Sequence, residues 1–326
     1  MLLFKTLIMS LNLDLYNKLF QGHSKKFCSL WSDEIAKSMN WSQKDGWIEV
    51  PNLFNNKKEL VYLPFLNFTC DEAIKKIANK SDKDLFQVRL IDEEKSSQAL
   101  KLNKEDLKNR KQDYAFDKNE LLSMRLNLKN DLWNKIFTSN LRRKIRKAQK
   151  SNFEVILGED EELVNKYYAL YNTCMKKYGM PVYPKLLLNN LVNSEIDLKI
   201  LIIKKNDKPI AGLVLILDEE LAWIPWAATN KAELSDYCNY LLYWEAINYS
   251  KEKGIKIFDF GRCSFGSSSY KFKRQFGTYH VVLKTMSNSK KNIYSKYLVA
   301  QYFWRLMPMK LKQFLDSKII YYLPDL

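Results

Sequence analysis

The stretch Lys256–Gly277 reads KIFDFGRCSFGSSSYKFKRQFG. It opens on a short run of isoleucine and phenylalanine, which is typical of a strand covered on both faces, and Gly261 ends this run. A loop rich in glycine and serine comes next, and aromatic and basic residues alternate from Tyr270 onward. Because such a loop offers hydroxyls and backbone amides to an anion or a developing oxyanion, we interpret the stretch as the active site.

One carboxylate, Asp259, lies inside the apolar run, where a charge needs a partner. Arg262, at the end of the strand, is the partner that we expect. The residues also allow a plainer interpretation, in which Asp259 caps the next turn and the basic residues are solvated. The combination favours a site, since Lys271, Lys273 and Arg274 bring positive charge to the same place.

The composition is that of a globular protein with anionic partners. The chain has 326 residues, 46% of them hydrophobic, a formal net charge of +16 and a pI of about 9.4. This charge favours nucleotide phosphates, phosphorylated lipid carriers, transfer RNA or an acidic membrane surface. Five scattered cysteines without metal-ligand spacing predict a reduced, cytoplasmic setting and no metal. No apolar run approaches the roughly 18 residues that span a bilayer, so we expect only peripheral membrane contact, at the inner face.

Hydrophobic periodicity predicts helices and strands along most of the chain. Asp131 opens one short helix through Phe137, and Asn206-Asp207 predicts a turn between two strands. The other helices that we expect lie at about 27–39, 70–79, 141–150, 161–178 and 235–252, with one more after Pro184. The strands that we expect lie at about 60–66, 85–91, 124–128, 199–204, 211–217 and 221–228.

The helix predicted at 141–150 is strongly basic. Leu141, Ile145 and Ala148 fall on one face, and arginine and lysine cover the rest. One interpretation is a solvated helix whose acidic partners lie elsewhere. The other is a helix that binds phosphate or pyrophosphate groups.

Four segments together resemble the Fem family, the peptidoglycan-bridge aminoacyltransferases and their relatives with GNAT-type acyltransferase folds. FDFGRCSFGSSSYKFKRQFG is similar to the C-terminal signature of the branch linked to exosortase and extracellular-polysaccharide systems, with Cys263 where serine is usual. The resemblance covers residues 60–326 and is best over 124–283. The other three segments are LPFLNF at 63–68, LRRKIRKAQK at 141–150 and YGMPVYP at 178–184.

The resemblance implies an α/β (α+β) fold, with two GNAT-like acyltransferase domains whose mixed, mainly antiparallel sheets are flanked by helices. The order of three antiparallel strands, a helix and a strand in the second half agrees with it. We expect a degenerate GNAT-like domain at residues 1–130 and a second GNAT-like domain with the signature at 131–287. The basic aromatic tail at 288–326 is expected to pack back onto the first domain, and an interfacial membrane helix is the alternative.

The resemblance also implies roles for residues. Lys273 would stabilise the oxyanion or leaving oxygen and Phe272 would wall the site, while Asp259 and Arg262 would orient the loop or the acceptor, with Asp259 a second choice as base. Only two histidines are present and neither lies in a nucleophile or metal constellation, so we expect direct attack by an amine. The expected substrate-binding residues are Arg142, Arg143, Arg146 and Lys147 for phosphates, with Tyr183, Asn239 and Tyr270 in the cleft.

Three functions stay open. The first is a Fem-like N-acyltransferase that moves an aminoacyl or other acyl group to an amine of a cell-envelope or polysaccharide precursor, carried on a nucleotide or lipid. The second is an acyl-CoA-dependent GNAT enzyme that acetylates an amino sugar; against it, Thr229–Asp236 has no glycine for a pyrophosphate. The third is a non-catalytic protein that binds RNA or anionic lipid. No tightly bound cofactor is expected, and the donor is either aminoacyl-tRNA or acyl-CoA.

Overall fold

The computed structural model describes residues 22–44, 47–51, 58–62, 85–92, 94–97, 120–129, 131–180, 182–287 and 307. The helix expected at 70–79 lies outside these ranges. So does the tail at 288–326, apart from Met307.

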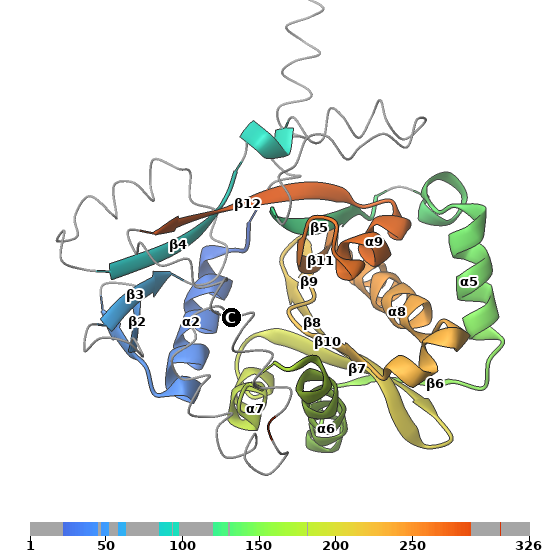
Figure 1. Cartoon of the computed structure of the whole chain (residues 1–326), viewed down its shortest axis with the longest axis horizontal. Helices are drawn as coiled ribbons and strands as arrows, with labels where there is room; N and C mark the ends of the chain where they lie inside the picture. The colour runs from blue at the N-terminus through green and yellow to red at the C-terminus, as the bar shows by residue number, and fades with distance from the viewer. Residues whose placement is uncertain are drawn as a thin grey trace, which may run out of the picture.

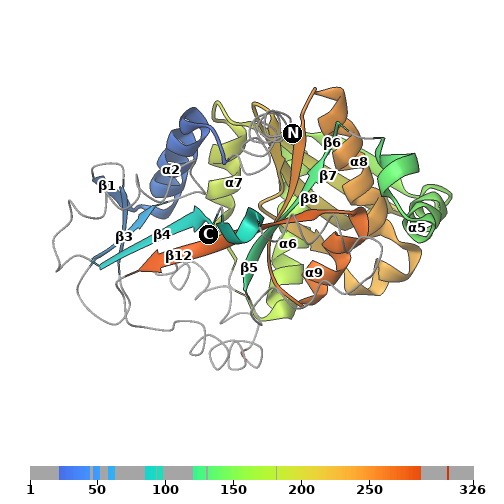
Figure 2. The same ribbon diagram turned by 90° about the horizontal axis from the view of Figure 1, so that it is seen from above.

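One mixed, mainly antiparallel sheet runs through the described part of the chain (Figures 1 and 2). Its strand order is β1-β2-β3-β4-β12-β5-β11-β9-β8-β7-β6, and β10 pairs with β8. Among the strands that the structure describes, β3 with β4 and β9 with β11 pair in parallel and the other pairs are antiparallel. The strands are β1 (Ser42–Lys44), β2 (Trp47–Pro51), β3 (Lys58–Tyr62), β4 (Leu85–Ile91), β5 (Leu121–Asn127), β6 (Glu154–Gly158), β7 (Asp197–Lys205), β8 (Lys208–Asp218), β9 (Leu221–Trp223), β10 (Ala227–Thr229), β11 (Ile257–Ser264) and β12 (Tyr279–Ser287).

Helices cover both faces of this sheet. In Figure 1, α6 and α7 lie below β7 and β8 with α2 beside α7, while α5, α8 and α9 gather at the other side. Figure 2 shows β1, β3 and β4 with α2 at one end of the molecule and α5 with α8 at the other. The helices are α2 (Lys25–Met39), α5 (Ser139–Gln149), α6 (Glu161–Tyr178), α7 (Lys185–Val192), α8 (Cys238–Glu252) and α9 (Ser268–Lys273).

Alternation along β8 divides the interior into two cores. Leu213 and Leu215 pack into the core of α5 and α8, whereas Val214 and Ile216 pack into the core of α2, α6 and α7. Side chains of successive strand residues point to opposite faces, so a continuous apolar run buries both faces of one strand. β8 therefore lies inside the protein on both sides.

Local signals place several elements where the sequence predicts them. α6 begins where the Asp160 side chain accepts from the N–H of Leu163, and it ends at Gly179, whose φ is 72°. Asn206 and Asp207 both have positive φ, 49° and 62°, as a tight hairpin turn between β7 and β8 requires. The expectations for α6, β7 and β8 are confirmed.

Two expectations about elements are wrong. The strand expected at 221–228 is interrupted at Ile224–Trp226, where Pro225 has no N–H for a ladder. β11 does not end at Gly261 but continues to Ser264. The short helix that Asp131 opens is present, as a single π-helical turn over Leu132–Ile136, and Phe137 is extended before Thr138 caps α5.

Polar contacts tie the first part of the chain to the second. The Asp218 carboxylate accepts from the Ser24 N–H at 2.7 Å and the Ser24 hydroxyl at 2.6 Å, and it lies 3.2 Å from Nδ1 of His23. Between α7 and α2, Asn190 donates to the Ser38 hydroxyl. β5, which precedes the expected boundary at residue 130, pairs with β11 and β12, which follow it. No helix in the described ranges is long and apolar enough to cross a membrane.

Two glycines with the same backbone conformation offer a matched test of the close approach in β11. Gly261 has φ 76° and Gly254 has φ 78°, but only at Gly261 would a Cβ atom overlap a backbone oxygen, that of Ile224. Gly254→Ala should cost about 1 to 2 kcal/mol of unfolding free energy through backbone strain alone. Gly261→Ala should cost about 3 kcal/mol or more, because overpacking adds to the strain. Urea denaturation of both variants measures the difference, and equal losses would contradict it.

Candidate active site

The site is built on a bulge in β11. The register between β11 and β5 shifts between Asp259 and Arg262, and Gly261 takes the positive φ inside the shift. Oδ1 of Asp259 accepts from the Gly261 N–H at 2.8 Å. The carboxylate therefore holds the backbone of its own strand.

The partner of Asp259 is Arg125 of β5, and the expectation of Arg262 is wrong. Nε of Arg125 donates to Oδ2 of Asp259 at 2.9 Å, and the Ser123 hydroxyl donates to Oδ1 at 2.5 Å. Arg125 is 1% exposed and Asp259 is 2% exposed. Adjacent strands place the two charges side by side, which nearness along the chain does not reveal. Neither Arg125 nor Ser123 was expected at the site.

Lys273 closes the bulge from the other side. Its Nζ donates to the backbone oxygens of Gly261 and Arg262, each at 2.9 Å, and the side chain is buried. An ammonium has three donors, and the third has no partner in the part of the chain that the structure describes. A buried cation with a free donor thus lies at the end of α9 against β11.

Burial also sets the protonation of this region. Burial lowers the pKa of Lys273 to about 8, against the opposing pull of Cys263 and Asp259. Burial raises the pKa of the Cys263 thiol to about 11. At neutral pH Lys273 is charged and Cys263 is a thiol, so the cysteine is a packing residue rather than a nucleophile.

The strand pairing beside the bulge ends abruptly. β9 pairs with β11 up to Asp259, whose backbone oxygen accepts from the Ile224 N–H at 3.0 Å. Beyond that point β10 pairs with β8 and the rest of β11 pairs with β5. The pairing of β9 with β11 has therefore ended before Gly261, the residue whose backbone oxygen accepts from Lys273.

The aromatic residues of the signature pack against α8. The Phe272 ring lies edge-on to Tyr240 at 5.1 Å and to Tyr243 at 5.2 Å, and it is partly buried. Tyr270 is 2% exposed and packs against Phe265 and His280. Phe272 can wall a site beside Lys273, whereas Tyr270 lies in the interior.

The basic helix is α5, and its predicted phosphate ligands differ in what they contact. Arg142 donates to the backbone oxygens of Trp133 and Phe137, which fixes the start of the helix. Arg143, Arg146 and Lys147 have exposed side chains. Arg143 hydrogen-bonds to Asn140, while Arg146 lies over the Trp133 ring and Lys147 over the Tyr237 ring.

A contact that the sequence did not predict joins α5 to the signature. Nζ of Lys144 donates to Oε1 of Gln275 at 2.6 Å and to the Tyr240 hydroxyl at 3.0 Å. The basic helix therefore lies beside α8 and the end of α9. Asn239, in the first turn of α8, hydrogen-bonds to the Thr229 side chain and does not face Lys273 in any contact described.

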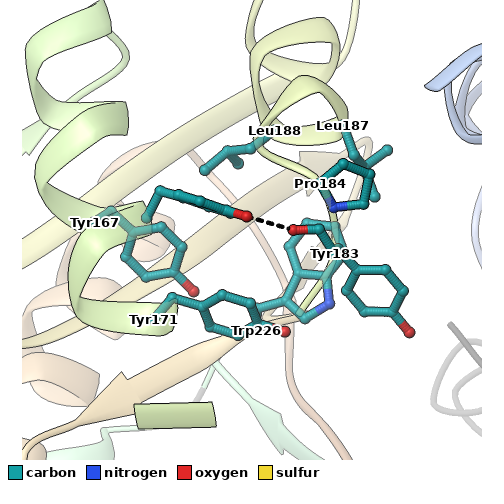
Figure 3. Close-up of a pocket in the computed structure, with 8 residues that line it drawn as sticks. Tyr167, Tyr171, Tyr183, Pro184, Leu187, Leu188 and Trp226 are labelled. Carbon is teal, nitrogen blue, oxygen red and sulfur yellow. Dashed lines mark hydrogen bonds between the residues drawn. The ribbon is translucent and has the colours of Figure 1, made fainter. Parts of the chain in front are cut away.

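Tyr183 lies on the opposite face of the sheet. Its ring packs on Trp226 at 5.9 Å, and its backbone oxygen accepts from the Tyr168 hydroxyl at 2.8 Å (Figure 3). The structure thus gathers Lys273, Phe272, Asp259 and Arg262 in one place, with α5 next to them and Tyr183 across the sheet.

Part of the chain matches one protein-family model. Residues 136–274 match the model described as an acetyltransferase (GNAT) domain. The match includes α5, the bulge of β11 and Lys273, so the candidate site lies within it. A comparison with curated protein sequences found no match.

Solved structures extend the likeness beyond residues 136–274. FemX superposes with a TM-score of 0.54 at 12% identity, covering 86% of this chain and 99% of that one. The structure of L-PGS from Bacillus licheniformis gives 0.53 at 11% identity, covering 86% and 97%. The C-terminal domain of a putative lysylphosphatidylglycerol synthetase from Agrobacterium fabrum gives 0.51 at 9%, covering 86% and 92%. At these identities the likeness concerns the fold, and the predicted fold class is confirmed.

The buried Arg125–Asp259 pair should be costly to break. Arg125→Met leaves a carboxylate without its cation in the interior, and we expect a loss of about 3 to 5 kcal/mol of unfolding free energy. The control is Lys166→Met, which breaks the exposed ion pair with Glu162 on α6 and should change stability far less. Denaturant unfolding measures both. Equal, small losses would show that Asp259 does not depend on Arg125.

Proposed function

We propose that the protein is a Fem-like N-acyltransferase, which moves an aminoacyl or other acyl group onto an amine of a cell-envelope or polysaccharide precursor. The observation that carries the proposal is Lys273, a buried ammonium at the point where β9 and β11 part, with one donor that has no partner among the described residues. Within this proposal, the protein is a member of the branch linked to exopolysaccharide systems and works in the cytoplasm.

The free N–H of Lys273 would stabilise the oxyanion that forms when an amine attacks the acyl carbon. The new bond joins the amine nitrogen to that carbon, and the bond to the leaving oxygen or sulfur breaks. The leaving atom takes the proton that the amine releases. A fixed, buried donor is effective here because it needs no reorganisation when the charge develops.

Asp259 then acts as a positioning residue and not as the base. Its two oxygens already accept from Ser123, Arg125 and the Gly261 N–H, and these bonds hold the bulge to which Lys273 is attached. Arg262 contributes its backbone oxygen to the same arrangement. Phe272, the neighbour of Lys273 in α9, packs against Tyr240 and Tyr243 and would wall the site.

Acyl-CoA is the alternative donor, since the matched family model is that of an acetyltransferase domain. The segment that precedes α8 favours aminoacyl-tRNA or another donor over acyl-CoA. It forms a 3-10 helix, Lys231–Asp236, and Tyr237 rather than glycine takes the left-handed conformation. The Asp236 carboxylate, paired with Lys205, also stands at this helix end, where a pyrophosphate would bring further negative charge.

A thermal-shift survey separates the donors. Coenzyme A thioesters, UDP-amino sugars, UDP-muramyl peptides and aminoacyl-tRNA are each added to the full chain. Stabilisation by a thioester favours the acyl-CoA enzyme, and stabilisation by a muramyl peptide or aminoacyl-tRNA alone favours the Fem-type reaction. Binding that weakens steeply with salt, without transfer from any donor, would overturn both.

Lys273→Met should lower kcat about 100- to 1,000-fold, as the loss of one oxyanion donor does. The matched control is Lys271→Met, two residues earlier on α9 and exposed, which should leave kcat nearly unchanged. Transfer should also fall as pH rises through about 8, where Lys273 loses its proton. Below that pH, activity should increase with pH, because the acceptor amine must lose a proton before it attacks. A fully active Lys273→Met enzyme would remove the lysine from the mechanism.

The exposed cations of α5 should act on binding instead of chemistry. Arg146→Gln with Lys147→Gln should raise KM for a phosphate-bearing substrate several-fold and flatten its salt dependence, with kcat little changed. Lys177→Gln, an exposed cation of α6 on the other face, serves as the control. An unchanged KM would show that the basic helix is only solvated.

A further inference from the structure

The strand β6 has an open outer edge. It is the last strand of the sheet on the side of β7, and all five of its residues pair with residues 200–204 of β7 (Figure 1). Among the residues that the structure describes, no strand pairs with its other side. The backbone N–H and C=O groups on that side can therefore pair with a strand from another chain.

Two apolar side chains on one face of β6 are exposed. Val155 is 39% exposed and Leu157 is 37% exposed. They point to the same face because they are two residues apart, and their partners on β7, Ile203 and Leu201, belong to the core of α5 and α8. Ile156, between them, faces the other way and packs against the core of α2, α6 and α7. The apolar layer on the face of α5 and α8 thus reaches the edge of the sheet, where its outermost side chains are partly uncovered.

β6 lacks the features that block edge pairing. Exposed edges of natural sheets often carry lysine, proline or a bulge. β6 contains none of these, since its sequence is EVILG and its register with β7 has no shift. Its single charge, the Glu154 carboxylate, already pairs with Nζ of Lys204 at 2.8 Å. The strand itself therefore leaves its edge available.

The charges at the two ends of β6 identify the partner that fits. Lys147 and Lys150 precede the strand, the acidic run EDEE at 159–162 follows it, and all of these residues are exposed. Antiparallel pairing with a second copy sets the basic end of each strand beside the acidic end of the other. Parallel pairing would set like charges together. The edge is thus complementary to itself, as a two-fold interface requires.

The exposed residues also select the register. A two-fold axis through an antiparallel pair places one residue opposite its own copy, because directly opposite side chains point to the same face. With the axis at Ile156, Val155 of each copy lies opposite Leu157 of the other, and Glu154 lies opposite Gly158. An axis at either neighbouring residue would set a carboxylate opposite an apolar side chain. Of these three registers, the one at Ile156 matches apolar with apolar.

We propose that two copies of the protein form a symmetric dimer through antiparallel pairing of their β6 edges, with the two-fold axis at Ile156. The sheet then continues from one copy into the other, and Val155 of each copy covers Leu157 of the other. In the strand order β7, β8 and β9 separate β6 from β11, so the candidate active site stays outside the interface. The dimer therefore does not rest on the proposed acyl transfer, and either proposal can fail alone. Because the paired strands are short, we expect a weak dimer, with a dissociation constant on the order of 10 μM.

The test is sedimentation velocity of the full chain from about 1 to about 200 μM, on both sides of the expected dissociation constant. The parent protein should pass from monomer to dimer. Val155→Lys and Leu157→Lys should each raise the dissociation constant about tenfold or more, since each buries two lysines in the interface. Thermal unfolding shows whether each variant is folded. The matched control is Leu186→Lys on α7, which changes another exposed leucine, 54% exposed, and should dimerise as the parent protein does.

Two cysteine variants test the register. Val155 and Leu157 of different copies lie directly opposite in the proposed dimer. An oxidised mixture of Val155→Cys and Leu157→Cys should therefore form a disulfide-linked dimer that neither variant forms alone. A chain that stays monomeric at every concentration would overturn the dimer, as would a dimer that Val155→Lys leaves intact or Leu186→Lys breaks. Cross-linking of either cysteine variant alone, as fast as in the mixture, would overturn the axis at Ile156.

Discussion

The bulge of β11 depends on two opposite charges that each bind backbone. Asp259 accepts the N–H of Gly261, and Lys273 donates to the oxygen of the same residue. A peptide held at both ends by buried charges cannot relax into a regular ladder, since either charge would lose a partner. The bulge in turn ends the pairing with β9 and brings α9 against the sheet. Arg125 balances Asp259, and one donor of Lys273 has no partner among the residues that the structure describes.

Much of the second half could be predicted from its sequence, because the signals there are local. Asp160 and Gly179 delimit α6, and the turn at Asn206 and Asp207 fixes a hairpin. β9, β10 and β11 were harder, since an apolar run does not show where a strand changes its neighbour. Pro225 was the available signal for the interruption, and the two charges that hold Gly261 become neighbours only in the folded chain.

The residues of the site also divide into those that local sequence signals reveal and those that meet only in the folded chain. Lys273, Phe272, Asp259 and Arg262 come from one short stretch, so the sequence was bound to bring them close. Their partners come from other strands and helices. Arg125 could have been found from the sequence, because it is the single charge in an apolar strand, as Asp259 is in the apolar run before Gly261. The two charges have opposite signs. Lys144 gave no such signal, since it is one of five cations in α5.

The anchoring of α2 has a consequence for how the chain is made. Ser24 caps α2, but the carboxylate that binds Ser24 belongs to Asp218, 194 residues later. At about 5 to 20 residues per second, a ribosome needs roughly 10 to 40 s to cover that interval. During that time Phe27 and Trp31 lack the ring contacts that they make with Trp223 in the folded chain. The anchoring of α2 can therefore be completed only after Asp218 and Trp223 have been made.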